Sequence, residues 1–235
     1  MKRFAVFLRS FFFNCLFFLF VAISSIAFLW ILLLPDRSFF AWILGWQHCV
    51  EWMERNILGL RSRVIGRENV PDGPCIIAAK HQSAWETLRL NILFYNPAIV
   101  LKKELVLLPI WGWYARRCGM IPIDRGGGAI ALMRMMDAAR RAKEEGRKIV
   151  IFPQGTRVPP GERKPYKSGI AALYKELNLP IVPMTVNSGL FWPKGAFIKK
   201  PGVITVEFLP PIPPGLPRQE MMRILESRLE TEAGS

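Results

Sequence analysis

The stretch "PCIIAAKHQSAWET", residues 74–87, contains the pattern that decides the fold of this chain. Its apolar run "CIIAA", residues 75–79, has the length and composition of a buried strand. A helical pattern begins a few residues later, and His81 falls between the two. Because open α/β sheets bind ligands at the carboxyl ends of their strands, His81 lies where chemistry is expected.

Strand-like and helix-like segments alternate through the rest of the chain. Further strands are expected at "SRVIG" (62–66), "AIVLK" (98–102), "MIPI" (120–123), "KIVIF" (148–152), "IVPMTV" (181–186) and "VITVEF" (203–208). Helices are expected near residues 84–95, 104–117, 129–145 and 166–178, and the proline-rich stretch 210–217 is expected to lead into a final helix. This alternation predicts an α/β domain with a largely parallel central sheet flanked by helices.

His81 is followed five positions later by Glu86. A neutral imidazole can accept a proton from a hydroxyl group, and a carboxylate can hold its other nitrogen in the correct tautomer. The pair therefore predicts a catalytic base and its orienting partner. The alternative is a capping box, in which Ser83 caps the helix and Glu86 closes the box three residues later. The two interpretations are compatible.

A second strand ends in a turn suited to an anion. The segment "KIVIFPQGTR", residues 148–157, places Gly155, Thr156 and Arg157 after the apolar run. Glycine lets the backbone approach a ligand, a hydroxyl can donate to phosphate oxygens, and arginine can bind phosphate through two parallel hydrogen bonds. The turn predicts a phosphate site, and an ordinary surface turn with a solvated arginine is the alternative.

Four blocks in order resemble those of the glycerophospholipid acyltransferases and together cover residues 75–190. They are "HQSAWE" (81–86), which resembles an H-x4-D block, "GMIPIDR" (119–125), "FPQGTR" (152–157), which resembles F-P-E-G-T-R, and "IVPMTVN" (181–187). The resemblance implies a catalytic role for His81 with Glu86 as its acidic partner. It implies phosphate binding for Arg125, Gly155, Thr156 and Arg157, with Lys103 and Lys167 as further basic candidates.

The chain departs from the family pattern at two positions. Glu86 replaces the usual aspartate, which lengthens the side chain but keeps the carboxylate. Gln154 replaces the usual glutamate and removes a charge, so no ionised base is present there. The first change preserves the expected dyad, and the second makes the acceptor less certain than the reaction type.

The resemblance implies transfer of a fatty acyl group from acyl-CoA or an acidic acyl-carrier protein to the sn-2 hydroxyl of lysophosphatidic acid, without a cofactor. Backbone amides at the start of the following helix are candidates for stabilising the oxyanion. An acyl-serine route through Ser83 is the mechanistic alternative, although no G-x-S-x-G motif surrounds this residue. Glycerol-3-phosphate or another lysolipid is the alternative acceptor. A non-catalytic basic membrane protein that binds anionic lipid is the remaining alternative.

The N-terminal segment is expected to attach the chain to a membrane. The run "FFFNCLFFLFVAISSIAFLWILLL", residues 11–34, is long enough to cross a hydrocarbon core, and a cleaved signal peptide is the alternative. A helical apolar stripe follows, with the members Phe39, Ile43, Trp46, Val50, Met53, Ile57 and Leu60. The stripe is expected to pair with the first helix or to lie in the lipid interface, and packing on the globular domain is the alternative. These features predict a membrane hairpin at 1–60 and an acyltransferase domain at 61–235.

Positive charge stands on both sides of the predicted hairpin. Basic residues precede it at Lys2, Arg3 and Arg9 and follow it at Arg55, Arg61, Arg63 and Arg67. Since both clusters prefer the cytoplasmic side, the domain is expected on the cytoplasmic face of the inner membrane. The net charge of +14 indicates anionic partners. Nucleic acid is not expected, because the basic residues are dispersed and no nucleic-acid-binding motif is present.

The cysteines and histidines predict neither disulfides nor a metal site. The four cysteines, Cys15, Cys49, Cys75 and Cys118, lack C-x-x-C spacing, and the chain has only two histidines. The cysteines are therefore expected to be buried apolar residues in a reducing compartment.

Overall fold

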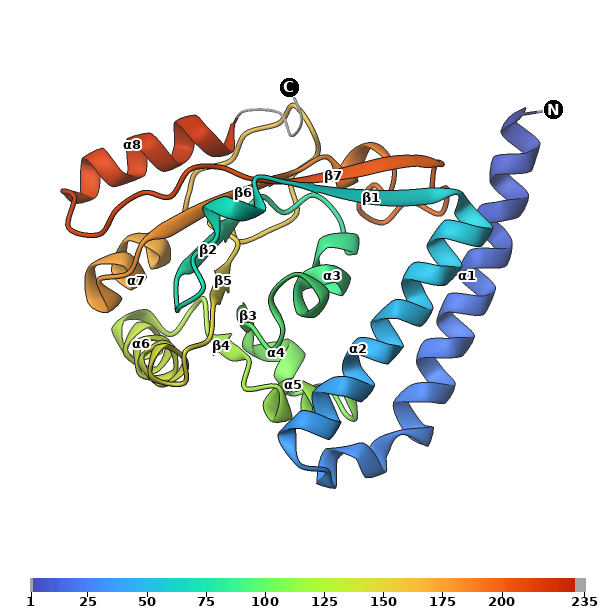
Figure 1. Ribbon diagram of the computed structural model, residues 1–235, viewed down its shortest axis with the longest axis horizontal. Coiled ribbons are helices and arrows are strands. Elements are labelled where there is room, and N and C mark those ends of the chain that lie inside the picture. The colour runs from blue at the N-terminus through green and yellow to red at the C-terminus, as the bar shows by residue number, and fades with distance from the viewer. Residues whose placement is uncertain (1, 231–235) are drawn as a thin grey trace.

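The computed structural model describes residues 2–230, and within them seven strands form one sheet (Figure 1). The strands are β1 (Leu60–Ile65), β2 (Ile76–Ala79), β3 (Ala98–Lys102), β4 (Ile121–Ile123), β5 (Ile149–Ile151), β6 (Ile181–Val186) and β7 (Gly202–Phe208). Their order is β1-β7-β6-β2-β5-β3-β4. Only the β6–β7 pair is antiparallel among these strands. The predicted α/β fold with a largely parallel sheet is confirmed.

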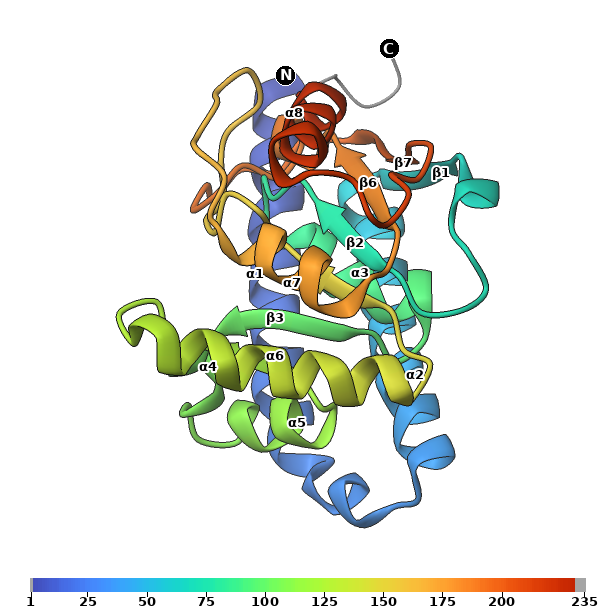
Figure 2. The ribbon, with the colours of Figure 1, turned by 90° about the vertical axis from the view of Figure 1, so that its left-hand side faces the viewer.

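Helices cover both faces of the sheet. They are α1 (Lys2–Ala27), α2 (Asp36–Met53), α3 (Trp85–Phe94), α4 (Lys103–Val106), α5 (Trp111–Arg117), α6 (Gly128–Glu144), α7 (Gly169–Leu177) and α8 (Arg218–Leu229). Figure 2 shows α6, α7 and α8 on the near side of the sheet, with α1 and α2 behind it. Helix α3 packs on the same face as the α1–α2 hairpin.

Alternate residues of the central strands build two cores. Ile76 and Ala78 of β2 pack with α6, α7 and α8, whereas Ile77 and Ala79 pack with α3 and the hairpin. This division follows from the two-residue period of a strand, and it explains why β2 is apolar throughout. The parallel pairing of β2 with β5 then places the carboxyl ends of both strands side by side.

The helix predicted over residues 104–117 is wrong as a continuous element. The structure contains α4 and α5 instead, with residues 107–110 between them. Pro109 has no backbone N–H and disfavours a helical conformation at the residue before it. Ile110 adopts a positive φ of 63°, which an α-helix does not allow. A separate helix, α5, then begins at Trp111.

The N-terminal hairpin packs along the domain. Trp46 Nε1 of α2 donates a hydrogen bond to Ser24 Oγ of α1 over 2.8 Å. Phe13 of α1 is completely buried in the core beneath the sheet, together with Val50 and Met53 of α2. The apolar stripe of α2 thus packs both against α1 and on the domain, so the predicted pairing and its alternative are both partly right.

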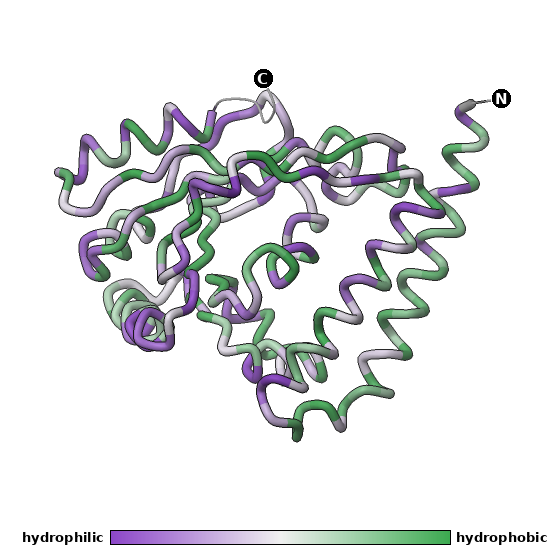
Figure 3. The backbone as a smooth tube through the Cα atoms, in the orientation of Figure 1, coloured by the Kyte–Doolittle hydropathy of each residue, from purple (hydrophilic) through white to green (hydrophobic). Residues whose placement is uncertain are grey.

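Much of the hairpin's other surface is apolar and exposed. Helix α1 is long and apolar enough to cross a membrane, and most of its side chains are not buried. Figure 3 shows α1 as hydrophobic along almost its whole length, whereas α2 alternates in hydropathy. Trp30, Trp42 and Trp52 are also exposed on the hairpin. Exposed tryptophans beside an apolar helix are typical of a membrane interface.

Candidate active site

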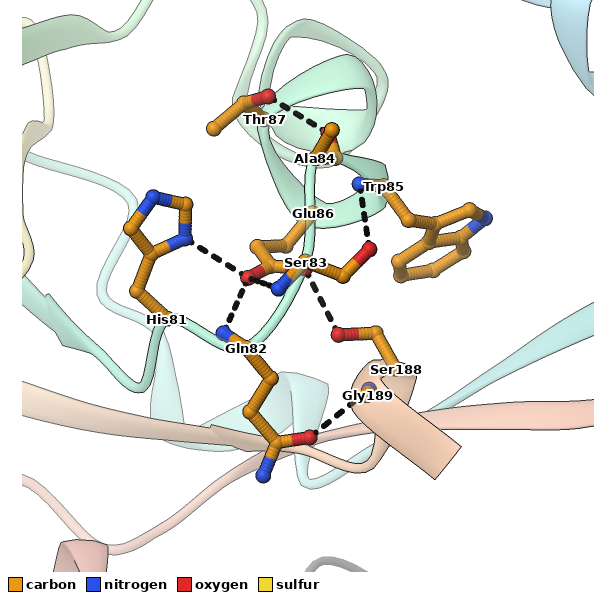
Figure 4. A network of polar contacts seen from close by, with 9 residues as sticks. All are labelled: His81, Gln82, Ser83, Ala84, Trp85, Glu86, Thr87, Ser188 and Gly189. Carbon is orange, nitrogen blue, oxygen red and sulfur yellow. Dashed lines mark hydrogen bonds and ion pairs between the residues drawn. The ribbon is translucent and has the colours of Figure 1, made fainter. Parts of the chain in front are cut away.

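The sequence-predicted dyad forms at the carboxyl end of β2. His81 Nδ1 lies 2.8 Å from Glu86 Oε1 (Figure 4). Glu86 is completely buried, and a carboxylate can only accept hydrogen bonds, so Nδ1 carries the proton. The free lone pair is therefore on Nε2. His81 lines a large cavity, so the pair has the arrangement of a base and its orienting carboxylate.

Glu86 also closes the start of α3, as the capping-box alternative predicts. Its Oε1 accepts hydrogen bonds from the backbone N–H groups of Gln82 (2.6 Å) and Ser83 (2.8 Å). Its Oε2 accepts one from Ser188 Oγ over 2.7 Å. These donors offset the cost of burying a carboxylate. One side chain thus caps the helix and orients His81.

Ser83 is engaged in holding this turn. It is completely buried, and its Oγ accepts a hydrogen bond from the Trp85 backbone N–H over 2.9 Å. This geometry disfavours the acyl-serine route, because the hydroxyl does not face the cavity. The amides of Gln82, Ser83 and Trp85 are likewise already donating within the turn, so these three do not form an oxyanion site.

The turn after β5 packs directly against His81. The Phe152 ring stacks on the imidazole, with centroids 4.1 Å apart. The Val158 backbone N–H donates to the His81 carbonyl oxygen over 2.7 Å. Gly155 has a positive φ of 67°, which favours glycine. A Cβ atom built on Gly155 would lie 3.6 Å from Lys167 Cγ and 3.8 Å from Arg125 Cζ. The turn therefore brings these basic side chains close to its backbone.

The cavity at this site has a volume of about 1390 Å³. One end contains the predicted base and most of the predicted phosphate-binding residues, namely His81, Arg125, Gly155, Thr156, Arg157 and Lys167. Lys102 and Lys194, which were not predicted, also line it. The other end runs between α3 and the hairpin, where Phe17, Val21 and Trp42 are among its apolar lining residues. A basic end and an apolar end suit an anionic amphiphile.

Lys103 is placed differently from the other predicted basic residues. Its Nζ forms an ion pair with Asp124, and the hydrogen bond from Lys103 lowers the pKa of that carboxyl group. Its neighbour Lys102 lines the cavity. Gln154 is a buried residue of the turn after β5, and its Nε2 has no hydrogen-bond partner among the described residues. Within residues 2–230, no group of three His, Cys, Asp or Glu side chains is placed to hold a metal ion.

Two residues that support the site were not predicted from the sequence. Ser188 directly follows the fourth block, and its adjacency to that block was the only available signal. Glu230 lies outside all four blocks. Its Oε2 accepts a hydrogen bond from Lys80 Nζ over 3.1 Å, and its Oε1 accepts one from the Tyr166 hydroxyl over 2.9 Å. Burial raises the pKa of Tyr166, so this hydroxyl stays protonated and donates. Glu230 thereby connects the residues that precede His81 and Lys167.

Comparisons with known proteins show which family this chain resembles. A family model described as "Acyltransferase" matches residues 61–187. A 1-acyl-sn-glycerol-3-phosphate acyltransferase from Pseudomonas aeruginosa is 36% identical over 195 residues, covering 80% of this chain and 76% of that protein. A protein of the same name from Saccharomyces cerevisiae is 30% identical over 183 residues, covering 72% of this chain and 60% of that protein.

A solved structure shares the fold. The crystal structure of the 1-acyl-sn-glycerophosphate (LPA) acyltransferase PlsC from Thermotoga maritima matches this chain with a TM-score of 0.75. The match covers 98% of this chain and 95% of that chain, at 20% sequence identity. The N-terminal hairpin is therefore included in the similarity.

Proposed function

The chain belongs to the acyltransferase family that includes the 1-acyl-sn-glycerol-3-phosphate acyltransferases, and from this we propose that it acylates the sn-2 hydroxyl of lysophosphatidic acid to form phosphatidic acid. The observation that carries the proposal is the single cavity that joins His81, a basic cluster and an apolar arm. The acyl donor in this proposal is a thioester of coenzyme A or of an acidic acyl-carrier protein.

His81 acts as the general base. Its Nε2 takes the proton of the acceptor hydroxyl while the hydroxyl oxygen attacks the thioester carbonyl carbon. The new C–O bond forms and the C–S bond breaks, and the proton passes to the sulfur of the leaving group. Glu86 is buried and bonded to Nδ1, so it stabilises the imidazolium that exists between the two proton transfers.

The basic end of the cavity fits the acceptor's phosphate. Arg125 and Lys167 approach Gly155, Arg157 lines the same cavity, and Thr156 adds a hydroxyl donor. Charge-assisted hydrogen bonds to phosphate are about twice as strong as neutral ones. The apolar end fits hydrocarbon chains. A phosphate held at one end and a chain held at the other would bring the glycerol hydroxyl between them to His81.

The exposed apolar surface of α1 supports attachment to a membrane, from which the lysolipid would enter the cavity. Basic residues precede and follow the hairpin, which favours the cytoplasmic face of the inner membrane. Hairpin residues line the apolar arm, so the arm would open toward the lipid that contains the substrate.

The test is an acyl-transfer assay with purified protein. Acyl-CoA and acyl-carrier-protein thioesters would each be offered with lysophosphatidic acid, glycerol-3-phosphate and lysophosphatidylcholine. We expect phosphatidic acid with the new chain at sn-2. His81→Ala should lower kcat by about 10²- to 10⁴-fold. His48→Ala is the matched control, because the other histidine is exposed and pairs with Glu51 on α2. Faster acylation of glycerol-3-phosphate would overturn the acceptor assignment, and wild-type turnover in His81→Ala would overturn the mechanism.

A further inference from the structure

The segment that runs from α4 into α5 is apolar and exposed. Residues 105–113 read "LVLLPIWGW" and include no charged side chain. Its exposed large side chains are Leu105, Leu107, Leu108, Trp111 and Trp113, and the exposed fraction of Leu107 is 69%. Single exposed apolar residues are ordinary on a protein surface, whereas a group of them marks a site of contact with a partner or a membrane.

This 105–113 segment lies beside the turn of the N-terminal hairpin, residues 28–35. The Tyr114 hydroxyl of α5 donates a hydrogen bond to the Ser25 carbonyl oxygen over 3.2 Å. Arg117 of α5 donates to the Leu34 carbonyl oxygen over 2.8 Å. Figures 1 and 2 both show α5 next to the end of the hairpin where α1 leads into α2. The segment and the hairpin turn therefore share one end of the molecule.

The apolar arm of the cavity is open at this end. Leu105 and Trp111 of the segment and Trp42 of the hairpin all line the cavity, yet each is at least 40% exposed. Side chains enclosed by a cavity would be largely covered, so the cavity meets the outside at these three positions. The Trp42 ring also contacts that of Trp30 in the hairpin turn, with centroids 5.2 Å apart. Aromatic side chains thus stand on both sides of the opening.

A lipid bilayer is the partner that fits this surface. The surface is continuous with the hairpin, whose helix α1 is long and apolar enough to cross a membrane. The hairpin turn adds the exposed side chains of Trp30 and Leu33. Tryptophan is enriched at membrane–water interfaces. Exposed basic residues stand on both sides of the segment, at Lys102 and Arg116, where they can attract anionic head groups.

Resting on the proposed function, we propose that the 105–113 segment is a second membrane contact. With the hairpin turn, it forms the entrance through which the hydrocarbon chain of the lysolipid passes from the bilayer into the cavity. Such an entrance spares the chain a passage through water, which would expose its whole apolar surface. Attachment and entry are then separate roles, because α1 holds the protein on the bilayer and the segment admits the substrate.

Fluorescence quenching tests whether the segment enters lipid. The background is Cys15→Ser with Cys49→Ser, in which the remaining cysteines are buried. An environment-sensitive fluorophore on Leu107→Cys is mixed with phosphatidylcholine–phosphatidylglycerol vesicles whose acyl chains are brominated. We expect a loss of fluorescence comparable to that of the same probe on Leu19→Cys of α1. Gln219→Cys on α8, which lies at the opposite end of the molecule from the hairpin turn, is the control and should keep its fluorescence (Figures 1 and 2). An unquenched Leu107 probe beside a quenched Leu19 probe would overturn the proposal.

Kinetics test whether this contact serves substrate entry. Leu107, Leu108 and Trp113 lie outside the described lining of the cavity, so replacing all three by serine should leave turnover of a short-chain lysolipid dissolved in buffer unchanged. The vesicle assay uses excess lipid, so that all of the protein sediments with it. There we expect the KM for embedded lysolipid to rise at least about tenfold, which corresponds to losing the apolar burial of about one side chain.

The matched control exchanges the same residues for apolar ones, as Leu107→Ile, Leu108→Ile and Trp113→Phe, and should keep the wild-type KM. A wild-type KM in the serine variant would overturn the entrance and leave the proposed function intact. A wild-type protein that acylated neither the dissolved nor the embedded lysolipid would overturn the proposed function, and the entrance with it.

Discussion

At the scale of single residues, Glu86 combines catalysis with capping, and its variants can separate these roles. In Glu86→Gln, the remaining oxygen can still accept hydrogen bonds from the backbone N–H groups at the start of α3. The new NH₂ group can donate a hydrogen bond to Ser188 Oγ, so the turn should remain folded. It loses the negative charge that stabilises the imidazolium. We expect kcat to fall by about 10²- to 10⁴-fold with little change in thermal unfolding. Glu86→Asp should retain more activity. Equal rates in the two variants would show that Glu86 acts only as a helix cap.

A separate prediction is that Arg157 binds the phosphate of the acceptor. It lines the basic end of the cavity, and a guanidinium binds phosphate in a bidentate manner that lysine cannot reproduce. Charge-assisted hydrogen bonds contribute about 1.5–3 kcal/mol, so Arg157→Ala should raise the KM for the acceptor by about ten- to a hundredfold. Arg157→Lys should be intermediate, and the donor's KM should hardly change. Lys164→Ala, in the same loop and exposed, is the control. A raised donor KM would assign the arginine to the donor's phosphates instead.

At the scale of elements, a buried carboxylate joins the hairpin to α3. Glu54 lies in the π-helical turn Glu54–Leu58 that follows α2, and it accepts hydrogen bonds from Trp85 and Arg89. Burial raises the pKa of Glu54 from 4.5 to about 7, although Arg89 acts in the opposite direction. Between these pH values the folded chain holds a proton that the unfolded chain has released. The free energy of unfolding should therefore decrease as pH rises through this window.

The pH dependence of unfolding measures this effect. In detergent micelles, the wild type should lose up to about 3 kcal/mol between pH 4.5 and pH 7 relative to Glu54→Gln, which cannot titrate. Glu162→Gln is the control, since that exposed carboxylate lies in the loop after β5 and is not one of the groups that shift the pKa of Glu54. This variant should keep the wild-type slope. Parallel curves for the wild type and Glu54→Gln would show that Glu54 is ionised throughout.

The elements themselves were largely predictable, because strand and helix periods depend on local sequence. Every predicted strand is present, and the break at Pro109 is the main error among the helices. The contact of His81 with Glu86 was also local, since both lie in one turn. Ser188 and Glu230 were not foreseen because their partners are 102 and 150 residues away in the chain. Such pairs depend on the order of strands in the sheet, which periodicity does not specify.

At the scale of the whole molecule, the N-terminal hairpin forms part of the folded domain and is not only a segment appended to it. Ser10 Oγ of α1 donates to the Lys199 carbonyl oxygen, and Asn14 Nδ2 donates to that of Phe197. At the turn of the hairpin, Arg117 of α5 donates to the carbonyl oxygens of Leu32 and Leu34. Deleting residues 1–60 would remove Phe13 and other side chains from the core. Membrane attachment therefore has to be tested without disturbing these contacts.

Four exposed positions on one face of α1 allow that test. Phe12, Leu19, Ile23 and Ile26 are all more than half exposed, and none of them lines the cavity. Burying such a side chain contributes about 1.5–3 kcal/mol, so replacing all four by serine should weaken partitioning into zwitterionic vesicles by at least about a thousandfold. Activity on vesicle-bound lysolipid should fall in parallel. Activity on a short-chain lysolipid dissolved in buffer should persist, because the active site is unchanged.

The control exchanges the same four residues for other apolar ones, as Phe12→Leu, Leu19→Ile, Ile23→Leu and Ile26→Leu. This variant should sediment with vesicles like the wild type. Zwitterionic lipid and high salt remove the attraction between the basic surface and anionic head groups, so sedimentation then reports apolar insertion alone. If the serine variant still bound such vesicles, α1 would not be the membrane contact. The exposed tryptophans of α2 and the loop before α5 would then be the surface to examine, since both carry large apolar side chains.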